Sequence, residues 1–260
     1  AELEAAGVRV ERRSAAASQA RLLNIGYVKR LATGRPWIRV KMAASLDGRS
    51  ALASGESQWI TGAPARTDGH RWRARSSLVL TGRATIADDD PSLNARVDAA
   101  ALGLDRPPHQ PGVAIVDREL RTPPHARVLD AHERVVIFCD ASAPRAWADA
   151  LRTRGAEIAV VAADAHGLEP GAVFAALGER GANEVHVEAG QTLSGRLLAT
   201  GYVDELILYM APTLLGEGAR GLFDMGPLAS LSERVDLHIR DVRPIGGDLR
   251  VQALPIIDRE

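Results

Sequence analysis

The chain has 260 residues, a formal net charge of −1 at pH 7, 46% hydrophobic residues and 25% charged residues. This length allows one large domain or two small ones with a sizeable core. The balanced charge argues against bulk affinity for nucleic acid or an acidic membrane. No apolar run approaches the roughly 20 residues that a membrane helix needs, and the N-terminus lacks a signal-peptide layout, so we expect a cytoplasmic protein.

The first 34 residues differ in pattern from the rest. Residues 5–13, AAGVRVERR, predict one short strand, and residues 14–34 predict a basic amphipathic helix that ends at Gly34. From Arg35 onward, short apolar runs rich in β-branched residues alternate with helical segments. We therefore treat residues 1–34 and 35–260 as separate units.

Nine apolar runs predict strands, and they cover residues 36–44, 77–82, 112–117, 134–140, 157–161, 184–190, 204–212, 237–245 and 248–256. Helices are expected over about 63–75, 144–154, 170–180 and 192–200. Continuous apolar strands of this kind suit a mostly parallel sheet covered by helices on both faces. The turn composition GGD between the last two strands predicts an antiparallel hairpin at the sheet edge. The expected class is α/β.

Cysteine and histidine provide no metal site. Cys139 is the only cysteine and lies in an apolar run, which predicts a buried strand thiol. The seven histidines are scattered, and no spacing among them matches a zinc site. His186 alternates with strand residues, so we interpret it as a core or sheet-face residue.

Three predicted strands run into small and polar residues, and ligands collect at such carboxyl ends in α/β sheets. The three segments are Lys41 to Gly62, Thr81 to Arg96, and Glu188 to Gly195. The first could be a flexible linker or a ligand site. In the third, a helix start with free backbone N–H groups would suit a phosphate, although Thr192 could simply cap the helix. The full G-x-G-x-x-G fingerprint is absent, so an ordinary Rossmann domain is not supported.

Two arginines stand out beside these strand ends. Arg73 belongs to a predicted helix whose other arginines we expect to form a solvated face, and these are Arg66, Arg71 and Arg75. Arg73 and Arg96 each lie near a hydroxyl-rich strand end, where a phosphorylated substrate would need a guanidinium group. The run Asp88–Asp90 before Pro91 is consistent with a turn, or with one carboxylate that faces a ligand.

Five linked motifs carry a family resemblance, and they are K-x-A-x-S-L-D-G-R, G-E-S-Q-W-I-T, L-x-G-x-x-T-x-x-x-D-[DN]-P-x-L, V-E-A-G-x-T-L-x-G and V-D-E-L-x-x-Y-x-A-P-x-L-L-G. In this order, from about Arg35 to the C-terminus, they resemble the reductase domain of the bifunctional riboflavin-biosynthesis deaminase/reductase. The resemblance implies a dihydrofolate-reductase-like α/β fold, a homodimer, and an NADPH-dependent oxidoreductase. The implied reaction reduces 5-amino-6-(5-phosphoribosylamino)uracil to its ribitylamino product.

The resemblance also assigns site residues. It places the nucleotide on Ala43, Trp59, Thr85, Asp89, Gly190, Gln191, Thr192, Leu193, Ser194, Gly195 and Arg196. It places the substrate on Ser57, Arg73, Leu93, Arg96 and Glu188. Arg118 lies where the family again approaches the nucleotide, in a variable loop. No metal is implied.

One departure from the family concerns the deaminase half. Its H-A-E motif and paired cysteines are absent, so residues 1–34 resemble only the tail of a deaminase domain and its linker helix. We expect a reductase-only form without deamination activity.

The catalytic candidates are Lys41, Asp89 and Glu188, which are ionisable and lie at strand ends. Our first assignment lets Asp89 and Glu188 position or protonate the opening sugar, while Lys41 supports one of them electrostatically or serves only as a structural ion pair. Two alternatives stay open: a related substrate, such as the undeaminated diaminopyrimidine or a pteridine- or antibiotic-pathway compound, and a nucleotide-binding module without turnover.

Overall fold

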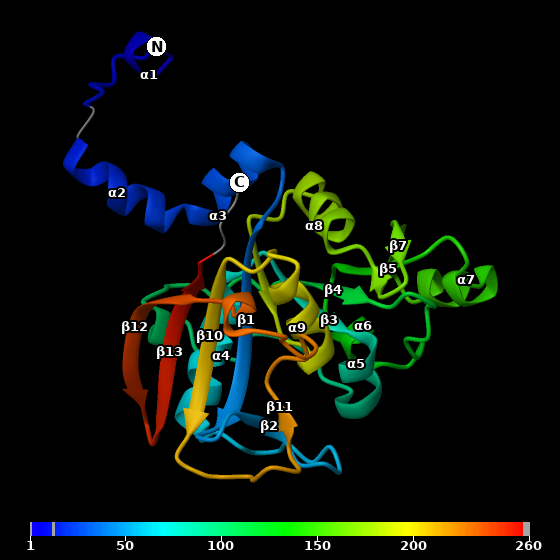
Figure 1. Ribbon diagram of the computed structural model, residues 1–260. Helices are drawn as coiled ribbons and strands as arrows, with labels where there is room; N and C mark the ends of the chain where they lie inside the picture. Colours follow the sequence, from blue (N-terminus) through cyan, green and yellow to red (C-terminus); the bar gives the residue numbers. More distant parts are fainter. Residues whose placement is uncertain (1, 12–13, 257–260) are drawn as a thin grey trace.

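The computed structural model describes residues 2–11 and 14–256. Figure 1 shows a twisted sheet with helices on both of its faces. The sheet has nine strands in the order β12-β13-β10-β1-β9-β3-β4-β5-β6. Their bounds are β1 Trp37–Ser45, β3 Leu78–Gly82, β4 Gly112–Val116, β5 Val135–Cys139, β6 Glu157–Val160, β9 Glu184–Val187, β10 Glu205–Ala211, β12 Leu237–Ile245 and β13 Asp248–Pro255.

All neighbours from β10 across to β6 pair in parallel, whereas β13 pairs antiparallel with both β10 and β12. The predicted α/β class with its antiparallel C-terminal hairpin at the sheet edge is therefore confirmed. All nine strand predictions are confirmed within three residues at each end. Their apolar runs were recognisable because strands covered by helices are buried on both faces.

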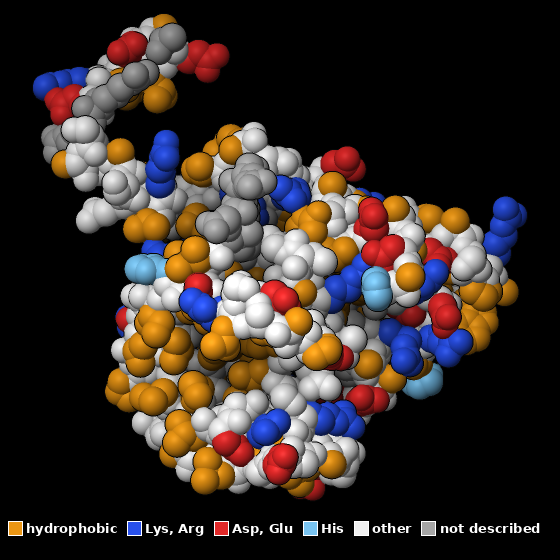
Figure 2. All heavy atoms as spheres, viewed as in Figure 1, with side chains coloured by type: hydrophobic (Ala, Val, Ile, Leu, Met, Phe, Trp, Pro, Cys, Tyr) orange, Lys and Arg blue, Asp and Glu red, His pale blue; other side chains and the backbone are white. Residues whose placement is uncertain are grey.

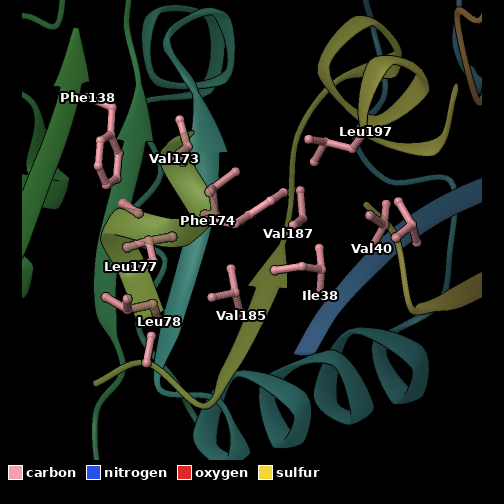
Figure 3. Close-up of a cluster of buried hydrophobic side chains, with 14 of the residues drawn as sticks. Ile38, Val40, Leu78, Phe138, Val173, Phe174, Leu177, Val185, Val187 and Leu197 are labelled. Atoms are coloured by element: carbon pink, nitrogen blue, oxygen red, sulfur yellow. The ribbon is translucent and has the colours of Figure 1, made fainter. Parts of the chain in front are cut away.

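Side-chain alternation along β1 separates two packed layers. Ile38 and Val40 belong to a cluster that includes α8 (Pro170–Glu179) and α9 (Gln191–Ala199). Figure 3 shows Phe174 and Leu177 of α8 directed toward the strand residues of this cluster. Each large apolar side chain buried in this way contributes about 1.5–3 kcal/mol.

The opposite face is covered by α4 (Ala63–Arg75), α5 (Arg83–Asp89), α6 (Arg127–Ala131) and α7 (Arg145–Thr153). Helices α4, α7, α8 and α9 confirm the four predicted helices. The sequence analysis missed α5 and α6, because 7 and 5 residues are too few to show a helical period. Cys139 is buried in β5, as predicted. Among the described residues, no helix is long and apolar enough to cross a membrane.

Short elements complete the structure. Two small antiparallel pairs join β2 to β11 and β7 to β8. The bounds of these and the remaining minor elements are β2 Arg49–Ala51, β7 Ala163–Asp164, β8 Gly167–Leu168, β11 Arg220–Gly221, and the 3₁₀ turns Ala100–Leu102 and Leu231–Glu233. The β2–β11 pair matters for the site, because it fixes the middle of the segment Lys41 to Gly62 against residues 220–221.

The N-terminal predictions need correction. Residues 5–11 form no strand: α1 covers Glu2–Ala5 and the chain then runs irregularly, while Arg12 and Arg13 lie outside the described residues. The predicted helix 14–34 is two helices, α2 (Ser14–Leu23) and α3 (Ile25–Thr33), and Gly34 ends the second in a left-handed conformation. Helices α1 and α2 contribute no buried residue and extend away from the body in Figure 1. The division into residues 1–34 and 35–260 stays a prediction; its positions 1 and 257–260 also lie outside the described residues.

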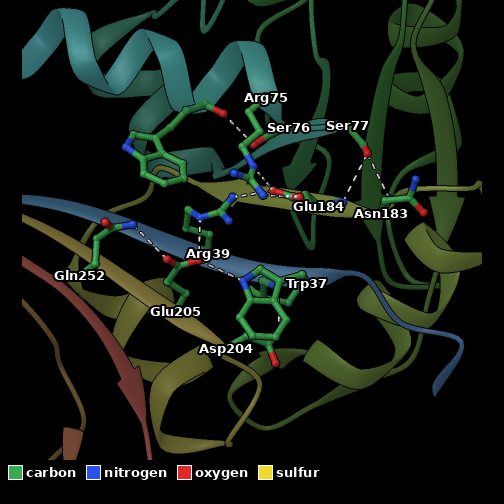
Figure 4. Close-up of polar contacts among 12 residues, drawn as sticks. Trp37, Arg39, Arg75, Ser76, Ser77, Asn183, Glu184, Asp204, Glu205 and Gln252 are labelled. Carbon is green, nitrogen blue, oxygen red and sulfur yellow. Dashed lines mark hydrogen bonds and ion pairs between the residues drawn. The ribbon is translucent and has the colours of Figure 1, made fainter. Parts of the chain in front are cut away.

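A buried ionic network fixes α4 against the sheet (Figure 4). Arg39 of β1 is 1% exposed, and its Nη1 and Nε each lie 2.9 Å from a carboxylate oxygen, of Glu184 and Glu205 respectively. Arg75 of α4 also pairs with Glu184, at 3.0 Å. Trp72 of α4 lies over the Arg39 guanidinium, 4.6 Å from it to the ring centre. Charges buried this way are stable only when paired, so the network fixes the position of α4 on the strands.

Helix α8 approaches the chain after α3 so closely that only glycine fits. A Cβ atom at Gly178 would lie 1.8 Å from the carbonyl oxygen of Gly34. We expect Gly178→Ala to lower the free energy of unfolding by about 1–3 kcal/mol, because this overlap outweighs the better helix propensity of alanine. Urea unfolding provides the measurement. At Gly218 a Cβ meets nothing within 4 Å, so Gly218→Ala should change stability by less than about 0.5 kcal/mol. Equal stability of the two variants would contradict this packing account.

Candidate functional site

A cleft of about 1150 Å³ opens where the carboxyl ends of β1, β3, β4 and β9 meet. The segment after β1, the N-termini of α5 and α9, and one side of α4 form its walls. A cleft at this place follows from parallel pairing, because all carboxyl ends of parallel strands lie at one edge of the sheet. All three strand ends chosen from the sequence therefore contribute to the same site, and the linker interpretation of Lys41 to Gly62 is wrong.

The cleft brings together most of the predicted site residues. Those that line it are Lys41, Ala43, Ser57, Trp59, Arg73, Thr85, Asp89, Leu93, Arg96, Arg118, Glu188, Gly190, Gln191, Thr192, Leu193 and Arg196. Ser194 and Gly195 do not line it. Ser194 is fully buried and its Oγ donates to the Ala189 carbonyl, while Gly195 packs against the backbone of Asp224. These two residues lie on the inner side of α9, where they seat the helix.

An ion pair forms the centre of the site. Nε and Nη2 of Arg73, on α4, donate to the two carboxylate oxygens of Glu188, at 2.5 and 2.9 Å. Both side chains are only 15% exposed. The backbone N–H of Glu188 donates to Leu80 of β3, which fixes the residue directly after β9. A bidentate pair with this burial holds the carboxylate in one orientation.

Lys41 lies beside this pair. The register of β1 and β9 places Arg39 opposite His186, so that two residues further Lys41 comes opposite Glu188. Its Nζ lies 5.7 Å from the centre of the Tyr209 ring. Within the described chain, the side chain of Lys41 makes no ion pair and no hydrogen bond. The ammonium is therefore held near a carboxylate without being neutralised by direct contact.

Burial and neighbouring charges shift the pKa values of Glu188 and Lys41 differently. Burial alone raises the pKa of Glu188, but Arg73, His186 and Lys41 together hold it well below its usual range. Burial lowers the pKa of Lys41, an effect that Glu188 opposes and Arg73 reinforces. Glu188 is thus ionised at neutral pH, and Lys41 is the group whose proton is more easily lost. Of the two roles that our first assignment gave to Glu188, an ionised carboxylate fits positioning the sugar better than protonating it.

His186 lies beneath the ion pair. It is fully buried in β9, and its Nε2 lies 3.4 Å from Oε1 of Glu188. Burial lowers its pKa, so the ring is neutral. Its interpretation as a sheet-face residue is confirmed by the burial, and its contact with Glu188 was not expected.

Asp89 lies on another wall of the cleft. It ends α5, is exposed, and accepts a hydrogen bond from Nε2 of Gln58 at 3.4 Å. Its neighbour Asp90 turns away and pairs with Arg127, so the acidic run divides between the cleft and a surface contact. Asp89 and Glu188 thus belong to separate parts of the site.

The arginines of α4 are less uniform than the sequence indicated. Of the four arginines of α4, all within the described residues, only Arg71 is both exposed and without an ion pair. Arg66 stacks on Trp59 at 4.5 Å and donates to the Thr61 carbonyl. Arg75 pairs with Glu184 but its side chain stays 41% exposed, so the expected solvated face is wrong only for Arg66. Trp59 keeps 68% of its surface exposed, and this flat surface lines the cleft.

The N-terminus of α9 is open toward the cleft. Gly190 caps the helix without any side-chain hydrogen bond, and a Cβ atom there would meet nothing within 4 Å. The backbone N–H groups of Gln191, Thr192 and Leu193 have no intrahelical acceptor, as in any first turn. Two arginines also line the cleft. Arg196, on α9 itself, pairs with Asp164, and Arg118, which follows β4, pairs with Asp140. These residues fit the phosphates of a dinucleotide.

His70 is a cleft residue that the sequence analysis missed. It lies on α4, one turn before Arg73, and contacts both Arg73 and Arg96. The spacing of three residues from Arg73 was the available signal, but it indicated only a shared helix face.

The amino-acid sequence is similar to those of known proteins. The RibD C-terminal domain family matches residues 36–251. The riboflavin biosynthesis protein RibD of Escherichia coli K12 is 38% identical over 237 residues, which are 89% of this chain and 63% of that protein. RibD of Haemophilus influenzae is 37% identical over 242 residues, 91% of this chain and 63% of that protein. The chain thus spans less than two thirds of the length of these curated relatives.

Two solved structures have a similar fold. Acinetobacter baumannii RibD superposes with a TM-score of 0.83 at 35% identity, covering 98% of this chain and 67% of that one. A Thermotoga maritima protein described as a diaminohydroxyphosphoribosylaminopyrimidine deaminase/5-amino-6-(5-phosphoribosylamino)uracil reductase shares the fold, with a TM-score of 0.74 at 24% identity over 92% of this chain and 62% of that one. With a family match over most of its length, the chain belongs to the RibD C-terminal domain family.

Proposed function

We propose that the chain is an NADPH-dependent oxidoreductase that reduces 5-amino-6-(5-phosphoribosylamino)uracil to 5-amino-6-(5-phosphoribitylamino)uracil in riboflavin biosynthesis. One observation supports this most strongly: the open helix start at Gly190 and the buried Arg73–Glu188 pair line the same cleft. The first feature suits a dinucleotide and the second suits a polar sugar. Family membership and the description of the Thermotoga maritima relative point in the same direction.

The nucleotide would lie along α9. Backbone N–H groups of Gln191, Thr192 and Leu193 would bind its phosphates, with Arg196 and Arg118 nearby. Ala43, Thr85 and Asp89 would border it, and Trp59 would offer its flat exposed face. When bound, NADPH supplies the hydride for the reduction.

The sugar would lie near Lys41. Opening the ribose ring to an imine at C1′ requires a proton to move to the ring oxygen, and Lys41 is the group with a lowered pKa at this place. Glu188, held ionised by Arg73, would orient the sugar hydroxyls and stabilise positive charge on the imine. Ser57 and Leu93 would contact the substrate, and Arg96 would bind its phosphate.

An assay with NADPH and purified aminopyrimidines tests the substrate. We expect NADPH oxidation with the deaminated phosphoribosylaminouracil. Faster turnover of the undeaminated diaminopyrimidine or of a pteridine would contradict the proposed substrate, and tight NADPH binding without any oxidation would favour a module without turnover.

Glu188→Gln is expected to lower kcat by roughly 100-fold or more, because the neutral amide cannot stabilise positive charge on the reacting sugar. Steady-state NADPH oxidation measures this, with circular dichroism to confirm folding. Glu157→Gln provides the control, because Glu157 is 52% exposed in a surface ion pair with Arg180. An unchanged kcat in Glu188→Gln would remove this residue from the reaction.

We also propose a homodimer formed at the free edge of β12. Leu237, Ile239 and Val242 of this strand are 40%, 61% and 52% exposed, and Figure 2 shows apolar side chains gathered over β12 and β13. A long, exposed edge strand that carries apolar side chains favours pairing with a second copy.

Light scattering should therefore give twice the 27.7 kDa of one chain, and Ile239→Lys should shift the protein to monomer. Val160→Lys is a matched control, since Val160 is also 61% exposed and lies on β6, at the opposite edge. A monomeric starting protein would contradict the proposal, as would a dimer that survives Ile239→Lys.

A further inference from the structure

The imidazole of His70 lies between Arg73 and Arg96, two of the arginines that line the cleft. Its Nδ1 is 3.3 Å from the backbone nitrogen of Arg96 and 3.5 Å from Nη1 of Arg73. Its Nε2 is 3.4 Å from both Nε and Nη2 of Arg96. Both ring nitrogens therefore face N–H donors, whereas a neutral imidazole has only one acceptor nitrogen. The ring therefore cannot accept at Nδ1 and at Nε2 at once, so the side chain of Arg96 and the donors at Nδ1 compete for it, and all four contacts are long.

Arg73 has few donors left for a ligand. Its Nε and Nη2 bind Glu188, and its Nη1 donates to the Asn94 carbonyl at 3.0 Å. Arg96 differs, because within the described chain its guanidinium contacts His70 and no carboxylate. The groups open to an anion at this end of the cleft are thus the Arg96 guanidinium and the His70 ring.

The backbone before Arg96 is shaped for this arrangement. Leu93 is 3% exposed and adopts a left-handed conformation with φ 52°, which a non-glycine residue seldom does. His132 contacts the neighbouring carbonyl of Ser92 through Nε2 at 2.6 Å. The turn that carries Arg96 back to α4 is therefore held in place, and Arg96 meets His70 across 26 residues of chain.

We propose that His70 binds the substrate phosphate together with Arg96, and that its ring takes up a proton from solvent when the phosphorylated substrate binds there. This inference rests on the proposed function only in taking the substrate to be a phosphate ester. No covalent bond of the substrate is made or broken in the step: one proton moves from solvent hydronium to a ring nitrogen, where an N–H bond forms and water is left behind, and the ring then donates where it previously accepted.

The charges around the ring explain the uptake. Burial, Arg73 and Arg96 lower the pKa of His70 to about 4, opposed by Glu188 and the Asn94 carbonyl, so the ring is neutral in the free protein at pH 7. A phosphate ester carries a charge of about −1.5 to −2 at this pH. Placed between Arg96 and the ring, it offsets the two arginines and raises the pKa of His70 toward its ordinary value.

The sign of the pH dependence follows. The complex binds more protons than the free protein, so the contribution of His70 to affinity is largest at low pH and is lost as pH rises through the pKa of the complex. Phosphate protonation also changes with pH, but it affects the wild-type protein and a His70 variant equally. The ratio of their affinities therefore isolates His70.

Proton NMR of the histidine Cε1–H signals tests the inference directly on the wild-type protein, with ribose 5-phosphate as the probe and ribose as its uncharged control. His70→Gln identifies the His70 signal. Without the probe, this signal should not titrate between pH 8 and 5.5. With saturating ribose 5-phosphate its midpoint should rise by about two pH units or more, while ribose leaves it unchanged.

Affinity provides the second measurement. His70→Gln should bind ribose 5-phosphate roughly 5- to 10-fold more weakly than wild type at pH 5.5, and the difference should nearly vanish at pH 8. His125→Gln, at an exposed position just before α6 and outside the cleft, should match wild type at both pH values.

Three results would overturn the inference. Bound ribose 5-phosphate that leaves the His70 midpoint unchanged would make the ring a neutral spacer, and so would a ratio of affinities that is constant with pH. Absence of ribose 5-phosphate binding would remove the phosphate from this place. NADPH oxidation is a separate readout: turnover without a His70 shift contradicts this inference alone, and a His70 shift without turnover contradicts the proposed function alone.

Discussion

The structure depends on pairing the charges buried between α4 and the sheet. Arg39 and Glu184 lie under α4, and Arg73 meets Glu188 at its edge. A buried ion without its partner costs several kcal/mol, so these pairs admit a single position of the helix. That position brings Arg73 to the carboxyl end of β9 and places His70 opposite Arg96. The packing of one helix therefore sets the geometry of the whole substrate end of the cleft.

The same pairing divides the chemistry among the charged groups. Glu188 is fixed in its ionised form by Arg73, which makes it suitable for stabilising positive charge and unsuitable for donating a proton at neutral pH. Lys41 lies on the neighbouring strand, is buried, and has a lowered pKa without a direct ion pair. A carboxylate that keeps its charge beside an amine that can lose its proton would suit the ring opening that we propose for the sugar.

The sheet was predictable from sequence, because apolar runs buried on both faces are distinctive, and so were the strand ends that form the cleft. Which residues of α9 face the cleft was not predictable from sequence. Ser194 and Gly195 belong to the family's motif, yet they pack inward. The network of Arg39 was hidden, since an arginine within a strand resembles a solvent-facing residue until its partners on β9 and β10 are known. His70 was missed because its contact with Arg96 depends on the turn at Leu93, which local sequence does not reveal.

The most direct test of the central claim is a crystal structure of the protein with NADPH and a phosphorylated aminouracil. We expect the nucleotide phosphates at the backbone of Gln191 and Thr192. The sugar C1′ should lie between the nicotinamide ring and the side chains of Lys41 and Glu188. The substrate phosphate should contact Arg96. A nucleotide bound away from α9, or a sugar that does not reach Lys41 and Glu188, would contradict the account.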